Sequence, residues 1–302
     1  MSRALKLALL ALLALAWIPN TWATPPASDP PVHVLQAPAS ESPVLRFAVI
    51  GDAEPKPKAE FPNLRAAVER INALAPRLGL QFVAGIGDIP HKATQIQYEA
   101  ATAELSRLEL PFYPIMGNEE FNGTQEEFLH NANRWNSGPT SIPDVRYVVD
   151  TPGMALIFAS PDRDGREFTD AGIRWIAARI EERAPKPVML FVHGAQVGVF
   201  PEGGDKGTGH PDFPRLAEAG ELKAIFSGDL HMDLDRVRGI RRVDGVHHVH
   251  VPALERTKIP DKSAHTPWFR IVSVYPNGLI QVQTVNALTG EIVPEHGALL
   301  LG

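Results

Sequence analysis

The sequence of 302 residues contains no cysteine. A chain without cysteine forms no disulfide bond and offers no thiolate to a metal ion. Any metal site in it must therefore be built from carboxylates, histidines, amide oxygens and water. The rest of the composition, 44% hydrophobic and 21% charged, is that of an ordinary globular protein with a sizeable core, in one large domain or two small ones.

An excess of basic residues is also lacking. There are 29 Lys and Arg against 35 Asp and Glu, which gives a formal net charge of −6 and a pI near 6.0. No basic cluster with interleaved aromatic residues is present either. Nucleic acid and anionic membranes are therefore disfavoured as the main partner.

An apolar run of about 20 residues, which a membrane-spanning helix needs, is absent too. The stretch 7–18 is apolar but shorter, and Arg3 and Lys6 precede it. Together with a cleavage motif of small residues at 21–23, it predicts a signal peptide at 1–23 that is cut after Ala23. A retained membrane anchor is the alternative. The predicted product is exported, periplasmic or secreted, without stable membrane insertion.

A linker rich in Pro, Ala and Ser follows at 24–43, and a single domain is predicted for 44–302. Within it, apolar strands alternate with amphipathic helices, which indicates an α/β fold. Asn63 is expected to cap the first helix, and Pro76 and Gly79 are expected to end it. Thr169 is expected to cap the helix 169–183. The other expected helices are 95–108 and 121–135. Strands are expected at 44–50, 80–86, 112–116, 146–150, 155–159, 188–192, 224–227, 242–251, 269–275 and 279–285.

Several catalytic motifs are missing. There is no Gly-x-Ser-x-Gly, no P-loop and no His-Glu-x-x-His. Gly85 and Gly87 begin a dinucleotide fingerprint, but Pro90 stands where its third glycine belongs. What the sequence does contain is five apolar strands that each end in a possible oxygen or nitrogen ligand. In an open α/β sheet such ends meet at one edge, so a polynuclear metal site near Asp88 is predicted. The five ligand-bearing segments are Gly51-Asp52-Ala53-Glu54, Gly87-Asp88, Gly117-Asn118-Glu119-Glu120, His193 and Gly228-Asp229-Leu230-His231.

These five motifs, in this order between residues 47 and 231, resemble the calcineurin-like metallophosphoesterases, the family that includes purple acid phosphatases. The resemblance implies a four-layer α/β sandwich of two mixed β-sheets flanked by helices, with the metal site at the C-terminal ends of the strands. It also implies hydrolysis of a phosphate monoester or diester by a metal-activated hydroxide, with two divalent ions bridged by Asp88. Carried over by position, one ion takes Asp52, Glu54, Asp88 and His231, and the other takes Asp88, Asn118, His193 and Asp229.

Three positions depart from the family pattern. Glu54 and Asp229 replace histidine ligands, and this substitution moves the site toward harder ions such as Mn²⁺ or Mg²⁺. Of the two expected ions, Mn or Fe is the first expectation and Mg or Zn the alternative. Glu119 replaces the histidine that contacts the phosphate in this family. To act as a general acid, Glu119 would need a raised pKa. His91 or His210 could supply the missing imidazole instead.

Asn118 and Lys206 are expected to contact a small phosphorylated substrate, Lys206 because it lies in the Gly-rich loop 194–214. The three histidines His247, His248 and His250 are interpreted as packing or surface residues. In a strand, the last two share one face and the first points away. Two functions therefore stay open: an exported metal-dependent phosphoesterase, and a catalytically impaired relative that binds metal or a phosphorylated ligand without efficient turnover.

Overall fold

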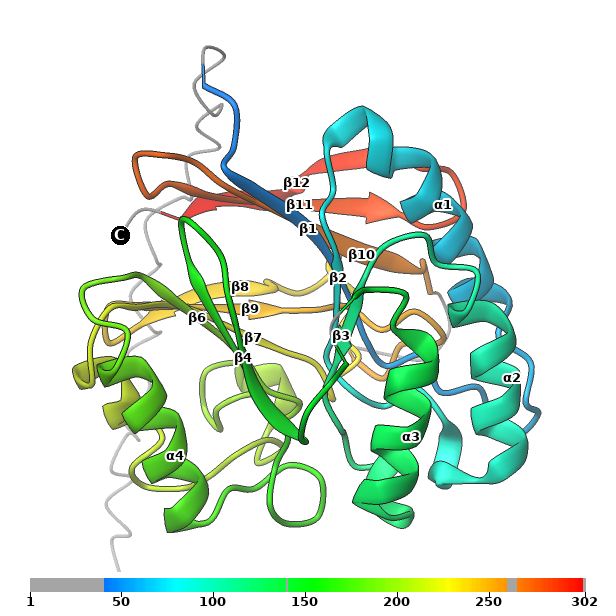
Figure 1. Ribbon diagram of the computed structural model, residues 1–302, viewed down its shortest axis with the longest axis horizontal. Coiled ribbons are helices and arrows are strands. Elements are labelled where there is room, and N and C mark those ends of the chain that lie inside the picture. The colour runs from blue at the N-terminus through cyan, green and yellow to red at the C-terminus, as the bar shows by residue number, and fades with distance from the viewer. Residues whose placement is uncertain (1–40, 140, 260–264, 301–302) are drawn as a thin grey trace, which may run out of the picture. The chain divides into compact units, whose positions relative to one another are not determined.

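A computed structural model describes residues 41–139, 141–259 and 265–300 (Figure 1). All of these residues belong to one compact unit. The predicted signal peptide and most of the predicted linker lie outside the described residues, so both stay predictions. Within the described ranges, no helix is long and apolar enough to cross a membrane.

Two mixed six-stranded sheets form the centre of the fold. The first has the order β12-β11-β10-β1-β2-β3, in which β1, β2 and β3 are parallel and β10, β11 and β12 add an antiparallel half. Its strands are β1 (Leu45–Ile50), β2 (Val83–Gly85), β3 (Phe112–Pro114), β10 (Trp268–Val274), β11 (Ile280–Asn286) and β12 (Ile292–Leu300).

The second sheet has the order β4-β5-β6-β7-β9-β8, with four parallel strands in the middle and an antiparallel strand at each edge. Its strands are β4 (Arg146–Asp150), β5 (Ala155–Ala159), β6 (Val188–Phe191), β7 (Leu222–Ser227), β8 (Ile240–Val243) and β9 (Val246–His250). In both sheets the parallel strands carry their C-terminal ends to the same edge, where the site lies.

The two sheets pack face to face through aromatic side chains. Phe47 of β1 lies 6.0 Å from Phe191 of β6, measured between ring centroids, and Phe191 stacks on Phe158 and Phe226. Because side chains alternate along a strand, Phe191 faces the other sheet and Leu190 faces away from it. The central strands are therefore buried on both faces, as their continuous apolar runs indicate.

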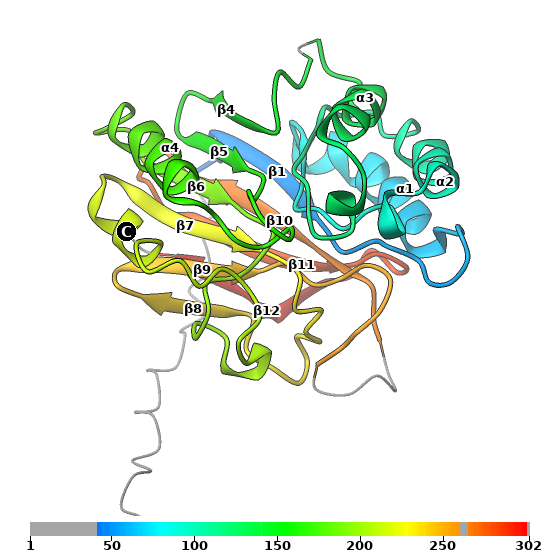
Figure 2. The same cartoon turned by 90° about the horizontal axis from the view of Figure 1, so that it is seen from below.

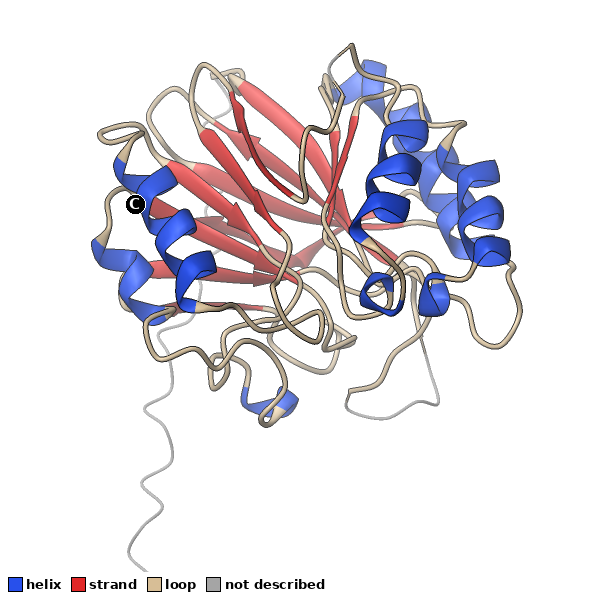
Figure 3. Ribbon diagram, turned by 60° about the horizontal axis from the view of Figure 1, so that its bottom comes forward, coloured by secondary structure: helices blue, strands red, loops and turns tan. Residues whose placement is uncertain are grey.

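Helices cover the two outer faces (Figures 2 and 3). Their bounds are α1 (Pro62–Leu78), α2 (Gln95–Leu105), α3 (Gln125–Trp135) and α4 (Asp170–Glu181). The first three pack on the first sheet, and α4 packs on the second through Ile173, Ile176 and Ile180. The order of layers is thus helix, sheet, sheet, helix, which confirms the predicted fold class.

Several element boundaries were predicted correctly. β4 and β5 have the expected bounds, and the Thr169 hydroxyl caps α4 by accepting from Gly172 N at 3.3 Å. His248 and His250 are buried in β9, whereas His247 is partly exposed. Burial lowers the pKa of His250 to about 3, and its Nε2 accepts from Met232 N. A neutral, packed histidine agrees with the interpretation made from the sequence.

Other expectations were wrong. Asn63 does not cap α1, because the helix begins at Pro62 and the Asn63 amide donates to Leu254 O at 2.9 Å instead. Pro76 lies inside that helix, which runs on to Leu78 and ends at Gly79. The expected strand 242–251 is a hairpin of β8 and β9, since Asp244 and Gly245 both have positive φ and turn the chain. β12 was not predicted.

Candidate metal centre

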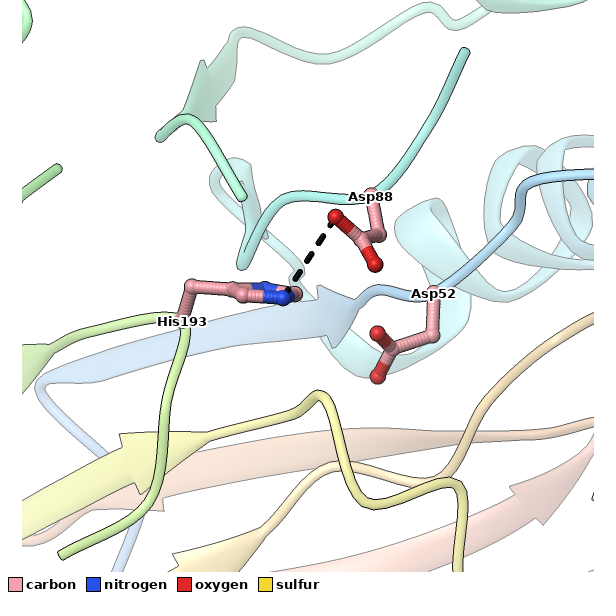
Figure 4. Close-up of side chains that lie close together, drawn as sticks. All are labelled: Asp52, Asp88 and His193. Atoms are coloured by element: carbon pink, nitrogen blue, oxygen red, sulfur yellow. Dashed lines mark ion pairs between the residues drawn. The ribbon is translucent and has the colours of Figure 1, made fainter. Parts of the chain in front are cut away.

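The predicted ligands lie at the C-terminal ends of the parallel strands. Asp52 follows β1, Asp88 follows β2, His193 follows β6 and Asp229 follows β7. Figure 4 shows the side chains of Asp52, Asp88 and His193 directed toward one another. The His193 Nε2 atom is 3.4 Å from Asp88 Oδ1. The fold therefore brings together residues that are far apart in the chain, since Asp229 N donates to Asp52 across 177 positions and His231 Nε2 lies 3.4 Å from Asp52 Oδ1.

The backbone of the site is held in an uncommon conformation. Asp52, Asp88, Asp229 and His231 have φ angles of 50°, 54°, 62° and 49°. For residues other than glycine, this left-handed region costs on the order of 1–3 kcal/mol each. Strain of this kind collects where side chains must be aimed for function, and here all four residues are predicted ligands.

One group of possible ligands consists of Glu54, Asp88 and His231. Each offers a ligand atom, and these atoms lie within 4.8 Å of one another. All three side chains are buried, and each has one buried atom without a hydrogen-bond partner: Glu54 Oε2, Asp88 Oδ2 and His231 Nε2. An unpaired buried polar atom costs about 1–3 kcal/mol, which a bound cation would remove for all three at once. These residues fit a metal ion.

The tautomer of His231 supports this fit. Its Nδ1 lies 3.0 Å from the carbonyl oxygen of Arg256. Because a carbonyl only accepts, Nδ1 must carry the proton, and in the neutral ring Nε2 then keeps a lone pair. Metal-bound histidines are oriented in the same way, with the second ring nitrogen donating to a carbonyl or carboxylate.

A second group consists of Asp52, Asp88 and His193, whose ligand atoms also lie within 4.8 Å of one another. Here the protein itself already pairs the atoms of Asp52 and His193. Both Asp52 oxygens accept from Asp229 N at 3.0 and 3.1 Å. The His193 ring lies 2.8 Å from Ile86 O through Nδ1 and 3.3 Å from Asn118 Oδ1 through Nε2.

The charge of His193 reflects its neighbours. Burial by itself lowers the pKa of an imidazole, but the carboxylate of Asp88 outweighs it and raises the pKa of His193 to about 10. For Asp52, burial acts to raise the pKa, but a protonated His231 and the charge of His193 outweigh it and hold the pKa of Asp52 well below its ordinary value. Within this group, His193 Nε2 and Asp88 Oδ1 pair with each other at 3.4 Å.

Asp229 is held by an arginine. Arg166 donates from Nε to Asp229 Oδ2 at 2.6 Å and from Nη2 to Asp229 Oδ1 at 2.7 Å. This is the bidentate geometry in which a guanidinium binds a carboxylate most strongly. Burial acts to raise the pKa of Asp229, but the bond from Arg166 and the charge of His193 hold it below its ordinary value. Neither group of possible metal ligands contains Asp229.

The comparison with protein families shows which family the chain belongs to. Residues 45–233, more than half of the chain, match the model of the calcineurin-like phosphoesterases. The chain belongs to this family. The match covers all five motifs, and members of the family typically bind two divalent metals. Its predicted membership is thereby confirmed.

Individual relatives are distant. The glycerophosphodiester phosphodiesterase GpdQ of Enterobacter lignolyticus is 26% identical over 130 residues, which are 42% of this chain and 45% of that protein. The match thus spans less than half of the curated relative. Among solved structures, GAP50 of Plasmodium has a TM-score of 0.55 at 14% identity, covering 82% of this chain and 86% of GAP50. YfcE of E. coli has a TM-score of 0.42 at 11% identity, covering 82% and 97%.

Glu119, at a family position usually held by histidine, has partners for both oxygens. Oε1 accepts from Lys56 Nζ at 2.9 Å, and Oε2 accepts from Lys92 N at 2.8 Å and lies 2.8 Å from His91 Nδ1. Burial acts to raise its pKa, but the bonds from Lys56 and Lys92 outweigh burial and lower the pKa of Glu119. Glu119 therefore does not have the raised pKa that a general acid would need.

Glu120, the next residue of the motif, joins two loops of the site. Its buried carboxyl accepts from Asp88 N, Ile89 N and Gly117 N at 2.8 to 3.0 Å. Burial, together with the charge of Asp88, raises its pKa to about 7, although the backbone donors act in the opposite direction. It ties the loop after β2 to the loop after β3 and thereby sets the position of Asp88.

Two predicted residues lie apart from this cluster. Lys206 is exposed in its loop, and His210 Nε2 lies 3.0 Å from Asp170 Oδ1 at the start of α4. His91, by contrast, contacts Glu119 at the rim of the site. The assigned catalytic, substrate and metal roles stay predictions.

Sequence reasoning missed the basic side chains of the site. Besides Arg166, they are Lys56, 3.1 Å from Glu54 Oε1, and Arg256, which donates to the same oxygen at 2.7 Å. A signal for Arg166 existed, because it follows strand β5 by seven residues, at the same edge as the other ligands. Nothing in the sequence places Arg256, 202 positions away, beside Glu54.

Proposed function

We propose that this chain is a metal-dependent phosphoesterase that hydrolyses a phosphate monoester or diester. The observation that carries the proposal is the set of three unpaired buried atoms on Glu54, Asp88 and His231, at positions where the family binds metal. Glu54, Asp88 and His231 would hold a divalent ion, which would supply polarisation of phosphoryl oxygens and a lowered pKa, toward about 7, for a bound water molecule. Mn or Fe is the proposed ion, with Mg or Zn as alternatives.

The chain's own residues supply the remaining charge and proton transfer. Glu119 is ionised and holds Lys56 and His91 on its two oxygens, so it acts as a positioning residue. The Lys56 ammonium, about one third exposed, is the group that binds a phosphate oxygen. His91 donates its Nδ1 proton to Glu119 in a hydrogen bond, and as the imidazolium it would pass its Nε2 proton to the leaving-group oxygen and become the neutral ring.

The substrate is proposed to be small and phosphorylated. The distant relative GpdQ is named as a glycerophosphodiester phosphodiesterase, so a glycerophosphodiester is the first substrate to test. Export to the periplasm or medium is proposed from the signal-peptide pattern. Cell fractionation that finds the protein uncut in the cytoplasm would reject that location.

The test uses purified protein stripped with a chelator and reloaded with Mn²⁺, Fe²⁺, Mg²⁺ or Zn²⁺. Phosphate release from a p-nitrophenyl monoester, the matching diester and a glycerophosphodiester is then measured across pH. Turnover that requires metal and is lost in Asp88→Asn supports the proposal. An absence of turnover at every pH, with metal demonstrably bound, contradicts it.

The role of His91 has a separate readout. His91→Asn should slow substrates with poor leaving groups more than p-nitrophenyl substrates, because only a poor leaving group needs a proton. The exposed His130 of α3 offers the matched control, His130→Asn, with no expected effect. Equal slowing of all substrates by His91→Asn would show that His91 is structural.

A second candidate function is binding without efficient turnover. It is favoured by the ion pairs of Arg166, Lys56 and Arg256, which hold carboxylate oxygens that would otherwise face a metal or water. GAP50, which shares the fold, is described as an anchor, and a fold alone does not establish catalysis. A large gain in turnover on Glu119→His would favour this candidate. A loss on the same change would favour the enzyme.

A further inference from the structure

The two groups of possible ligands differ in how completely the protein satisfies them. In the group Glu54–Asp88–His231, every residue has a buried atom without a hydrogen-bond partner, and His231 Nε2 has only the longer contacts of 3.4 Å to Asp52 Oδ1 and 3.8 Å to Glu54 Oε2. In the other half of the site, both nitrogens of His193 and both oxygens of Asp229 have protein partners. A metal in the first half removes a cost, whereas a metal in the second half must displace existing bonds.

Arg166 is built into the second half. Its neighbour Gly165 has a φ of +75° and packs so closely on Asn118 that a Cβ would overlap the Asn118 backbone. On the other side, Glu167 accepts from Gly209 N at 2.6 Å. The loop is therefore fixed between two other loops of the site, and the guanidinium is delivered to Asp229 by close backbone packing. The carboxylates of Asp229 and Asp88 raise the pKa of Arg166.

The charges of the site give an independent argument. Three cations are ion-paired to its carboxylates: Lys56, Arg166 and Arg256. Even with neutral imidazoles, five carboxylates and three cations leave two negative charges, which one divalent ion neutralises. A second divalent ion would lie beside the guanidinium and add two uncompensated positive charges. The carboxylates counted are Asp52, Glu54, Asp88, Glu119 and Asp229. An ionised Glu120 and the Lys258 ammonium, which donates to Asp229 O at 3.5 Å, would cancel each other and leave this balance unchanged.

We propose that Arg166 takes the place of the second metal ion, so that this chain binds one divalent ion, at Glu54, Asp88 and His231. A guanidinium has five N–H donors, and two of them serve Asp229. The others remain for a second oxygen of the substrate's phosphate, which planar donors of this kind bind well. The phosphate contact rests on the proposed function, whereas the count of metal ions does not.

The experiment counts ions. The full exported chain is stripped, loaded with excess Mn²⁺, freed of unbound ion and analysed for metal per chain. Electron paramagnetic resonance then distinguishes an isolated Mn²⁺ ion from two exchange-coupled ions. The expected result for the wild type is about one ion per chain with the spectrum of an isolated ion. About two ions with a coupled spectrum would overturn the proposal.

Variants sharpen the test. The double change Arg166→Met with Asp229→His removes the guanidinium and offers an imidazole, so about two coupled ions are expected. Arg163→Met, at an exposed residue of the same loop, is the matched control and should stay at one. A double variant that is folded by circular dichroism and still binds one ion would count against the proposal. If it does not fold, the wild-type spectrum decides alone.

The outcomes separate this inference from the proposed function. One bound ion without any turnover leaves the inference intact and contradicts the phosphoesterase. Two coupled ions with turnover contradict the inference and support the phosphoesterase. One bound ion with turnover supports both, and Arg166→Lys should then raise KM for the phosphate ester by about tenfold, because an ammonium cannot serve Asp229 and phosphate with planar geometry.

Discussion

The two halves of the candidate metal centre share Asp88, but they differ in how many of their polar atoms the protein itself pairs. On one side, Glu54 and His231 have buried atoms without a hydrogen-bond partner; His231 Nε2 lies 3.4 Å from Asp52 Oδ1 and 3.8 Å from Glu54 Oε2. On the other side, His193 and Asp229 find their partners within the chain, above all in Arg166. Two sites with similar residue types can therefore differ in metal affinity, because what matters is which atoms remain unpaired after folding.

The largest effect is expected for Asp88→Asn. This change removes a charge that both halves share, so metal binding should fall by more than about 100-fold, since even partners in the outer shell contribute about 10–100-fold. Isothermal titration with Mn²⁺ measures it. Binding close to wild type would show that the ion lies elsewhere.

Glu54→Gln tests the unsatisfied half alone. The amide keeps the shape but loses the charge, and Mn²⁺ affinity should fall at least about tenfold. Glu60→Gln is the matched control, because Glu60 is an exposed carboxylate of the same loop and belongs to neither group of possible ligands. Equal losses for both variants would remove the distinction between ligand and neighbour.

Asp229→Asn tests the satisfied half. The change leaves the half-buried Arg166 without a charged partner, and stability should fall by roughly 1–3 kcal/mol. The affinity for the first ion should change less than twofold. Urea denaturation and Mn²⁺ titration on the same sample give both values. A large loss of affinity with unchanged stability would make Asp229 a ligand rather than a partner of Arg166.

The smallest effect is expected for Glu104→Gln, which breaks a similar arginine pair far from the site. Arg65 donates to both oxygens of Glu104, and this bond lowers the pKa of Glu104 below its ordinary 4.5. Because Arg65 is more than half exposed, the loss at neutral pH should be about 0.5–1 kcal/mol. Metal binding should not change.

The pH dependence of that loss follows from the direction of the shift. A lowered pKa in the folded state stabilises the protein above pH 4.5, and this contribution disappears as the pH falls through the folded-state pKa. Thermal melting of wild type and Glu104→Gln should therefore converge in acid. A difference that stays constant from pH 7 to pH 3 would contradict the assignment to this ion pair.

Much of the fold could be predicted because its signals are local. The apolar runs of β5, β6 and β7 and the cap of α4 depend on residues close in sequence, and each run places a polar residue at a strand end. The prediction of a single strand at 242–251 failed at one turn. The turn at Asp244 and Gly245 was read as part of one strand, because the apolar and histidine pattern continues across it.

The pairing of the site could not be predicted from sequence. Lys56 is two positions from Glu54, yet whether it contacts Glu54, Glu119 or solvent depends on where the loop after β3 lies. For the same reason, the sequence could not show whether Glu119 has the raised pKa that a general acid needs. In the fold it is an ion-paired carboxylate, because three groups from two other loops reach it.

The sequence by itself determined the family, the layered fold and the edge of the sheets where the ligands gather, since each follows from residue order and periodicity. Tertiary structure alone decided which of those ligands remain unpaired. Burial makes every polar atom find a partner or carry a cost, and the partners come from loops far apart in the chain. That condition separates Glu54, Asp88 and His231 from the half of the site that Arg166 completes.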